Sequence, residues 1–131
     1  MLTYSPSGAL SPYYYKGGYF HGIHYGSYFS DHESLIKMMH EEEAFILKSA
    51  ERKKIMIDLY ETELSPIVIE HFLQHLKNIK PRIFKLSIAT DKASLKRLAK
   101  AMKKDKELQP LPCYFTTDME EGKTWLVSDN F

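Results

Sequence analysis

The chain has 131 residues, 44% of them hydrophobic and 27% charged, with a net charge of +1. These are ordinary values for one globular domain with a single core, and they argue against binding of nucleic acid through overall positive charge. A single cysteine, Cys113, excludes an intrachain disulfide and fits a reducing compartment. No apolar run approaches the ~20 residues that span a bilayer. Residues 1–15 lack the pattern of a secretory signal, so we expect a cytoplasmic protein.

Aromatic and charged residues are unevenly distributed. Seven of the nine tyrosines lie in residues 1–30. Residues 31–63 carry nine acidic and five basic side chains, whereas residues 77–106 carry eleven basic and two acidic ones. A neutral chain with such a basic segment is expected to present one positive face.

The first third of the chain predicts a hairpin followed by a helix. Residues 1–9 are expected to be a loose segment that precedes a single domain over residues 10–131. Residues 11–29 are rich in aromatics and interrupted by Gly17-Gly18, which predicts two strands joined by a tight turn. Ser30 or Asp31 then caps a helix that runs to Ala50.

Strands and helices alternate from residue 55 onwards. IMIDL (55–59) predicts a buried strand, Ser65-Pro66 opens a helix that Pro81 ends, and RIFKLSIAT (82–90) predicts the next strand. Asp91 caps a helix over 91–104, residues 111–116 form a last strand, and Thr117 or Asp118 caps a closing helix. The predicted core includes Ile55, Ile57, Leu59, Ile83, Leu86, Ile88 and Phe115.

The order β-β-α-β-α-β-α-β-α predicts an α/β domain. Strands that are separated by helices favour a mainly parallel sheet with right-handed crossovers and flanking helices. The N-terminal hairpin adds an antiparallel edge to this sheet.

This order, the strand IMIDL before a Ser-capped helix, and the ending CYFTTDMEEGKTWL over residues 10–127 resemble the STAS domain superfamily. Phe115, Glu120, Trp125 and Leu126 match its STAS-like branch, which is related to the sporulation anti-sigma-factor antagonist and to lipid-binding domains. The resemblance implies a STAS-like fold and a role in binding. Glu63-Leu64-Ser65-Pro66 stands where phosphorylatable members have an Asp-Ser pair and a glycine. This departure argues against kinase-driven exchange of partners.

The loop 61–65 is the first candidate site. It leaves the carboxyl end of a strand, where open α/β sheets place ligands, and opens a helix. We expect Glu61, Glu63 and Ser65 to dock a protein partner. Ser65 is expected to act mainly as the helix cap, with phosphorylation as the alternative role.

The helix 91–104 is the second candidate site. Its apolar side chains share one face, and its cations lie on the other. We expect weak, salt-sensitive binding to anionic surfaces through Lys92, Lys96, Arg97, Lys100, Lys103 and Lys104.

The remaining chemistry-bearing residues predict no catalytic or metal site. His71 and His75 share a helix face but have no third ligand, and we expect them at its solvated margin. His21 and His24 point to opposite faces of a strand and are expected at its surface, with a pocket that they line together with Tyr19 and Tyr25 as the alternative. We expect core packing for Cys113 and solvation for the loop acids Asp58, Glu61 and Glu63.

These patterns predict a non-enzymatic regulatory or scaffold module without a cofactor. The alternative is a lipid or small-ligand domain that uses the aromatic N-terminal strands together with helix 91–104. Tyrosines 13–15 also suggest a sheet edge at which a homodimer forms, because tyrosine combines contact area with a polar tip.

Overall fold

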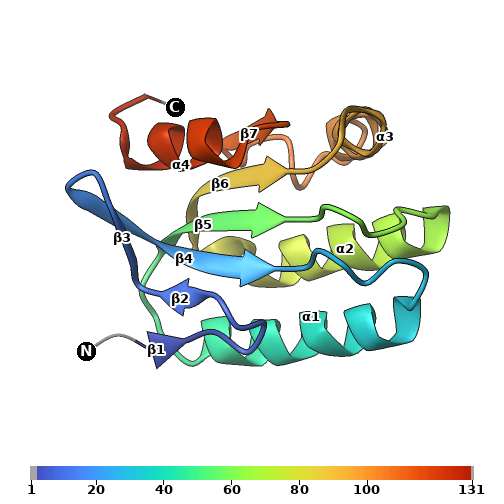
Figure 1. Cartoon of the computed structure of the whole chain (residues 1–131), viewed down its shortest axis with the longest axis horizontal. Coiled ribbons are helices and arrows are strands. Elements are labelled where there is room, and N and C mark those ends of the chain that lie inside the picture. Colours follow the sequence, from blue (N-terminus) through green and yellow to red (C-terminus); the bar gives the residue numbers. More distant parts are fainter. Residues whose placement is uncertain (1–2, 131) are drawn as a thin grey trace.

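Five strands form one sheet in the order in which they occur along the chain (Figure 1). The computed structural model describes residues 3–130. β3 pairs antiparallel with β4, and each later pair is parallel. The predicted α/β class, with a mostly parallel sheet and an antiparallel hairpin at its edge, is thereby confirmed. The strands are β3 (Tyr13–Tyr15), β4 (Gly18–His24), β5 (Lys53–Asp58), β6 (Ile83–Ala89) and β7 (Cys113–Thr116).

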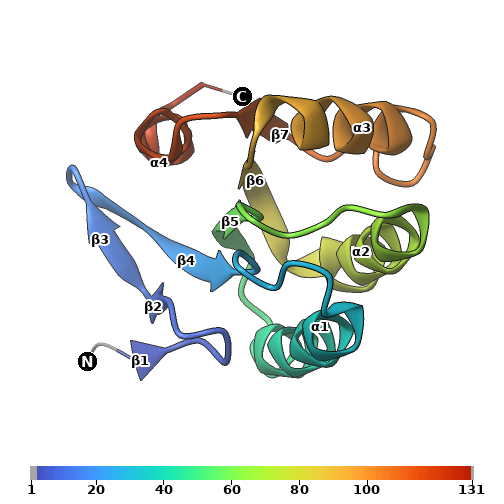
Figure 2. The same cartoon turned by 45° about the vertical axis from the view of Figure 1, so that its right-hand side comes forward.

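Three helices connect the parallel strands and cover one face of the sheet (Figure 2). They are α1 (His32–Leu47), α2 (Pro66–Ile79) and α3 (Lys92–Lys103); a 3-10 turn, η1 (Lys80–Arg82), follows α2. Right-handed crossovers between successive neighbouring strands place every connecting helix on the same side. α4 (Met119–Val127) packs against β5, β6 and β7 from the other side.

Each helix begins at a residue that the sequence marks as a cap. The side chains of Asp31, Ser65, Asp91 and Asp118 each accept a hydrogen bond from a backbone N–H in the first turn. These bonds satisfy donors that have no partner inside the helix. The structure therefore confirms the predicted helix starts.

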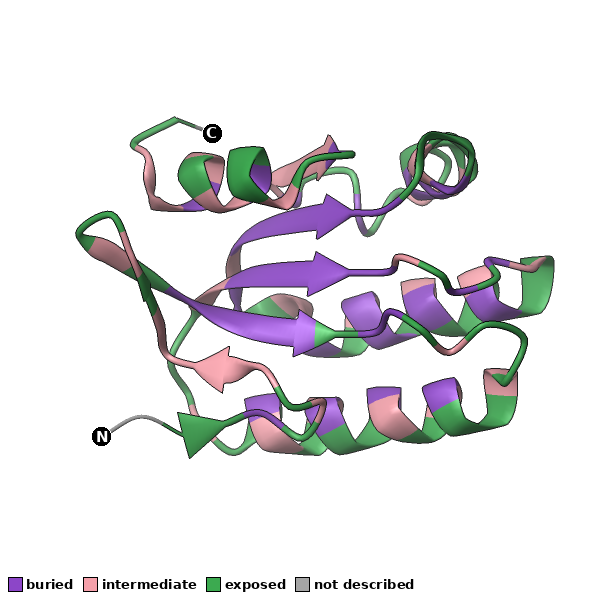
Figure 3. Cartoon of the chain, in the orientation of Figure 1, coloured by how far each residue is buried: buried purple, intermediate pink, exposed green. Residues whose placement is uncertain are grey.

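The core has one layer on each side of the sheet, and the central strands β4, β5 and β6 are buried along most of their length (Figure 3). Six of the seven predicted core residues are at most 2% exposed. Phe115 is half-buried against the larger layer. Strands covered on both faces are expected to be near-continuously apolar, which is the pattern of IMIDL.

Lys85 interrupts the apolar run of β6, and its amino group binds the end of α4. Its side chain is fully buried, and its amino group donates to the carbonyls of Trp125 (2.7 Å) and Ser128 (3.2 Å). It also lies 4.2 Å from the centroid of the Trp125 ring. Burial lowers the pKa of this amine. Lys85 thus binds the carbonyl end of the closing helix, and Leu126 docks that helix in the core as expected.

The N-terminal segment is more ordered than the sequence predicts. Residues 3–9 contain β1 (Thr3–Tyr4), which pairs antiparallel with β2 (Leu10–Ser11). Ser7 donates from its N–H and its hydroxyl to Glu42 on α1. The expectation of a loose segment over 1–9 is corrected for these residues, because a buried carboxylate binds them; residues 1–2 lie outside the described part.

Two details of the hairpin also differ from the prediction. The turn is formed by Lys16 (φ 45°) and Gly17 (φ 84°), and Gly18 already belongs to β4. Positive φ at both central residues suits the twist of a two-residue hairpin. The second strand ends at His24 instead of continuing to residue 29.

Within residues 3–130, the helices are too short or too polar to cross a lipid bilayer.

Candidate functional site

A pocket lies where the parallel strands begin. It has a volume of about 670 Å³ and lies between the hairpin, the end of α1 and the starts of β5 and β6. Five of its residues are aromatic: Tyr14, Tyr19, Phe20, Phe45 and Phe84. Four are cationic: Lys48, Arg52, Lys53 and Lys54. We call this site the aromatic–basic pocket.

Positive charge dominates this pocket. Glu51 is the one carboxylate that lines it, and it is exposed. Within residues 3–130, the four cations form no ion pair. Lys53 and Lys54 are half-buried, so water screens their charges less than those of fully exposed lysines. The guanidinium of Arg52 lies 5.4 Å from the centroid of the Phe84 ring.

Two side chains of the pocket wall, Ser11 and His21, form a hydrogen-bonded series with the buried Glu42. The Ser11 hydroxyl lies 2.6 Å from Nδ1 of His21, and Nε2 of His21 lies 3.1 Å from Oε1 of Glu42. Ser11 and His21 line the pocket, and the His21 ring stacks on Phe45 with centroids 5.5 Å apart. His21 is 2% exposed, which corrects its expected place on the strand surface. The neighbouring α1 packs over this side of β4 and supplies Glu42 as its partner.

Glu42 is fully buried, yet its environment favours the carboxylate form. Burial alone raises the pKa of this group, but hydrogen bonds from His21 and Ser7 outweigh that effect and hold the pKa below its ordinary value. An ionised carboxylate accepts hydrogen bonds only. Nε2 of His21 therefore carries the proton of this contact, and in the tautomer with its only proton on Nε2, Nδ1 accepts from the Ser11 hydroxyl.

The opposite end of the sheet contains the predicted docking loop. Residues 25–29 run beside residues 58–63 and pair with them through backbone bonds such as Ser27 N–H to the Tyr60 carbonyl (2.7 Å). Ser27, Phe29 and Glu61 have positive φ values of 63°, 52° and 57°. Such conformations are strained for residues other than glycine and persist only where neighbouring structure holds them.

The predicted docking residues lie along this pair of loops. Glu61 and Glu63 are exposed, and Phe29 between them is 60% exposed. Ser65 is half-buried, and its hydroxyl accepts from the Val68 N–H at 3.3 Å. The cap role of Ser65 is confirmed; docking and phosphorylation stay predictions.

Asp58 departs from its predicted solvation. It is 8% exposed, and its carboxylate lies 2.8 Å from Nδ1 of His24, whose side chain is half exposed. Parallel pairing of β4 with β5 places these two residues opposite one another at their strand ends. Asp58, which was expected to be a solvated loop acid, thus ends β5 in a part-buried polar contact.

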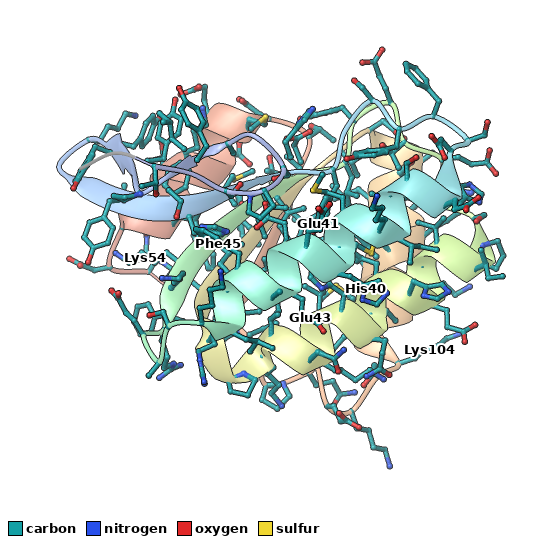
Figure 4. The ribbon with its side chains drawn as sticks, turned by 90° about the horizontal axis from the view of Figure 1, so that it is seen from below. His40, Glu41, Glu43, Phe45, Lys54 and Lys104 are labelled. Carbon is teal, nitrogen blue, oxygen red and sulfur yellow. The ribbon has the colours of Figure 1, made fainter. Side chains whose placement is uncertain are left out.

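Five basic residues of the second candidate site lie on α3, Lys104 follows its last residue, and all six are exposed. None of them lines the aromatic–basic pocket. Figure 4 labels Phe45 and Lys54 at one end of the α1–α2 layer and Lys104 at the other. The structure therefore separates the aromatic strands from the basic helix, which the sequence-based alternative had combined in one site.

His75 is buried rather than at the margin of α2. Its Nε2 lies 2.8 Å from the Tyr25 hydroxyl, and its Nδ1 lies 3.2 Å from Glu43 on α1. Burial lowers the pKa of this histidine, although Glu43 opposes the shift. His71 is exposed, as expected. Among residues 3–130, no three His, Cys, Asp or Glu side chains are arranged to hold a metal ion.

Cys113 and the tyrosines of β3 complete the candidate residues. The Cys113 side chain packs against the core, and burial raises the pKa of its thiol, which leaves it poorly reactive. Tyr14 on the edge strand is 65% exposed, and its neighbour Tyr19 is 55% exposed. Dimerisation through this edge stays a prediction.

Sequence reasoning did not identify Ser11, His21 and Glu42 as a group. Ser11 is on β2, His21 is on β4 and Glu42 is on α1, and these elements are adjacent in space only after the chain has folded. The one available signal was a glutamate at the inward spacing of α1, with Leu35, Met39 and Ile46. A charged residue at a core position calls for a buried partner.

The fold and the pocket define a small α/β domain with a mostly parallel sheet and a cationic, aromatic-lined pocket. Comparisons of the chain with models of protein families, with curated proteins and with solved structures find no match.

Proposed function

We propose that the domain binds a small anionic ligand with a flat apolar body in the aromatic–basic pocket. The observation that carries this proposal is the composition of the pocket, in which five rings and four cations surround about 670 Å³ with one carboxylate. That volume is in the range of drug-sized ligand sites.

Each half of the ligand follows from the residues that would contact it. Aromatic side chains favour flat apolar partners through stacking and area burial. Cations without carboxylate partners favour an anion, because no carboxylate of the described residues competes with the ligand for them. The resemblance to a branch that is related to lipid-binding domains favours an amphiphilic ligand of this kind.

The test uses 8-anilinonaphthalene-1-sulfonate, a flat apolar dye with one negative charge. The wild-type protein should raise its fluorescence with saturation, and affinity should fall with added salt. The triple variant Lys48→Glu, Arg52→Glu, Lys54→Glu should weaken binding by about tenfold or more, since a loss of 1.4 kcal/mol suffices for a factor of ten. The uncharged analogue N-phenyl-1-naphthylamine should bind more weakly.

The control variant is Lys96→Glu, Lys100→Glu, Lys103→Glu on α3. It changes the net charge equally but lies outside the pocket. Equal weakening in both variants would indicate an effect of overall charge and contradict the pocket, as would absence of saturable binding to wild type. The same pair, tested on anionic vesicles at low salt, also examines the expectation for α3. Only the α3 variant should then lose retention.

A protein partner at the paired loops 25–29 and 58–63 is the second candidate. The exposed ring of Phe29, held between Glu61 and Glu63 by backbone bonds, favours it. Affinity capture with wild type and with the double variant Phe29→Ser, Glu63→Lys should identify partners that only the wild type retains. A partner lost instead with the Lys48, Arg52 and Lys54 variant would place docking at the pocket.

A further inference from the structure

We propose that Ser11 is an activated nucleophile and that the aromatic–basic pocket hydrolyses esters with a flat, anionic alcohol or acyl part. The nucleophile is inferred from the contacts of Ser11, His21 and Glu42 alone. The substrate class rests on the proposed function.

The three side chains have the arrangement that activates a serine. A nucleophile needs a base within about 2.6–3.2 Å, and the base needs a group that orients it. Ser11 lies 2.6 Å from Nδ1 of His21, and Glu42 lies 3.1 Å from Nε2. The roles of the two ring nitrogens are exchanged relative to the usual Ser-His-Asp triad, in which the serine contacts Nε2. Either nitrogen can act as the base once the other is held by a carboxylate.

The support behind His21 is buried and rigid. Glu42 is fully buried and is held by the N–H and the hydroxyl of Ser7, at 2.9 and 2.5 Å. Stacking on Phe45 fixes the plane of the imidazole. Side chains that are locked by packing and by further hydrogen bonds hold a reactive geometry without reorganisation.

Ser11 differs from the other hydroxyls of this network in its access to the pocket. Ser5 is buried and Ser7 lies behind Glu42, whereas Ser11 is half-buried and lines the pocket beside His21. If these hydrogen bonds served only to hold the N-terminal segment against α1, the Ser11 hydroxyl would not need to lie at the pocket wall. The positive charge of the pocket favours the negative oxygen of a tetrahedral intermediate.

The reaction balances with water as the second substrate. The Ser11 oxygen forms a bond to the ester carbonyl carbon while its proton passes to Nδ1 of His21. The bond from that carbon to the alcohol oxygen then breaks, and the proton on Nδ1 passes to the departing oxygen. Water attacks the acyl-serine, loses a proton to Nδ1 and releases the carboxylic acid, and Ser11 regains its proton. Glu42 stays ionised throughout and is a positioning residue.

The first experiment is labelling of the purified protein by a fluorophosphonate, with the modified residue located by mass spectrometry. Ser11 should be modified in the wild type. Ser11→Ala should not be modified at any serine. In His21→Asn, Ser11 should be modified at least about 100-fold more slowly than in the wild type. Ser30→Ala, which changes an exposed serine outside the pocket, is the matched control and should react as the wild type does.

The second experiment measures hydrolysis of 8-acetoxypyrene-1,3,6-trisulfonate, a flat anionic ester. Wild type should release the fluorescent alcohol with turnover, and Ser11→Ala should lose this activity. Glu42→Gln should lower kcat with KM little changed, because an amide can donate to Nε2 and reverse the tautomer. Ser11→Cys should keep a nucleophile at this position, unlike Ser11→Ala, and should form an acyl-enzyme.

Failures of this proposal and of the proposed function are distinguishable. Absence of label on Ser11, or hydrolysis equal in wild type and Ser11→Ala, overturns the nucleophile even if the sulfonate dye binds. Labelling of Ser11 without dye binding supports the nucleophile and overturns the anionic ligand. Loss of dye binding in Glu42→Gln would show that Glu42 supports the pocket structurally, and would remove its assignment as a positioning residue.

Discussion

The two ends of the parallel sheet are built in opposite ways. At the carboxyl ends of β4 and β5, the following loops pair with each other through their backbones and through Thr62, whose hydroxyl donates to the Tyr25 carbonyl at 2.7 Å. At the amino ends, the hairpin, α1 and β5 diverge and leave the aromatic–basic pocket. Open α/β sheets usually bind ligands at the carboxyl ends of their strands. Here backbone pairing fills that region between β4 and β5, so the space for a ligand lies at the other end.

The difference also concerns how each end is stabilised. The amino end depends on buried side-chain contacts around Glu42, whereas the carboxyl end depends on backbone bonds and strained φ values. Truncation of side chains should therefore affect the first end most, and added bulk should affect the second. Four predictions test this comparison.

Glu42→Ala should have the largest effect. Removing one member of a buried, hydrogen-bonded charge network leaves its partners unsatisfied and costs about 3–5 kcal/mol. The free energy of unfolding from urea titration measures this loss. Glu41→Ala is the control, because Glu41 is exposed on the same helix and should change stability by less than about 0.5 kcal/mol. Equal effects of the two substitutions would contradict the buried network.

Gly26→Ala should destabilise the carboxyl end. A Cβ atom at this position would lie 2.4 Å from Oδ1 of Asp58 and 2.9 Å from the Tyr60 carbonyl oxygen. Both loops must move apart, and overpacking of this kind costs about 1–3 kcal/mol. Denaturant unfolding gives the total. Hydrogen exchange should show faster opening at residues 25–29 and 58–63 than in wild type, and unchanged exchange there would argue against the paired loops.

Ser65→Ala should lose the cap of α2, at a cost of about 0.5–2 kcal/mol. Ser65→Asp keeps an acceptor for the Val68 N–H and should preserve the melting temperature. If a partner of the paired loops is identified and binds Ser65→Ala normally but not Ser65→Asp, charge at this position acts as a switch. No change of stability in either variant would show that the cap contributes little.

Acid should weaken the amino end through Glu42. The pKa of Glu42 is lower in the folded than in the unfolded chain. Between these two pKa values the unfolded chain therefore binds more protons than the folded chain, and stability rises with pH. The contribution is complete above the unfolded pKa of about 4.3 and is lost as pH falls through the folded pKa. Glu42→Gln should therefore differ less from wild type as the pH of the urea titration is lowered. A constant difference would contradict the ionised carboxylate.

Local patterns in the sequence predicted most of the fold. IMIDL and RIFKLSIAT indicated strands covered on both faces, and the Ser65-Pro66 pair, Asp91 and Asp118 marked helix starts. These features depend on residues a few positions apart, because caps and apolar periodicity act within one element. The predicted turn at Gly17-Gly18 differs by one residue from the observed turn at Lys16-Gly17. Both pairs contain Gly17, so the position of the glycine did not distinguish them.

The sequence by itself thus determined the order of the elements from β3 onwards, the mainly parallel sheet and the exposed basic face of α3. Only the tertiary structure decided the partners of buried polar groups. Ser11, His21 and Glu42 lie up to 31 positions apart in the chain, and His75 meets Tyr25 across the core. The contacts of Ser11, His21 and Glu42 arise when α1 packs beside β4. The periodicity of one segment does not encode which of its polar side chains will contact a polar side chain of another segment. A buried charge must find a partner, but which residue fills that place is set by the packing of distant segments.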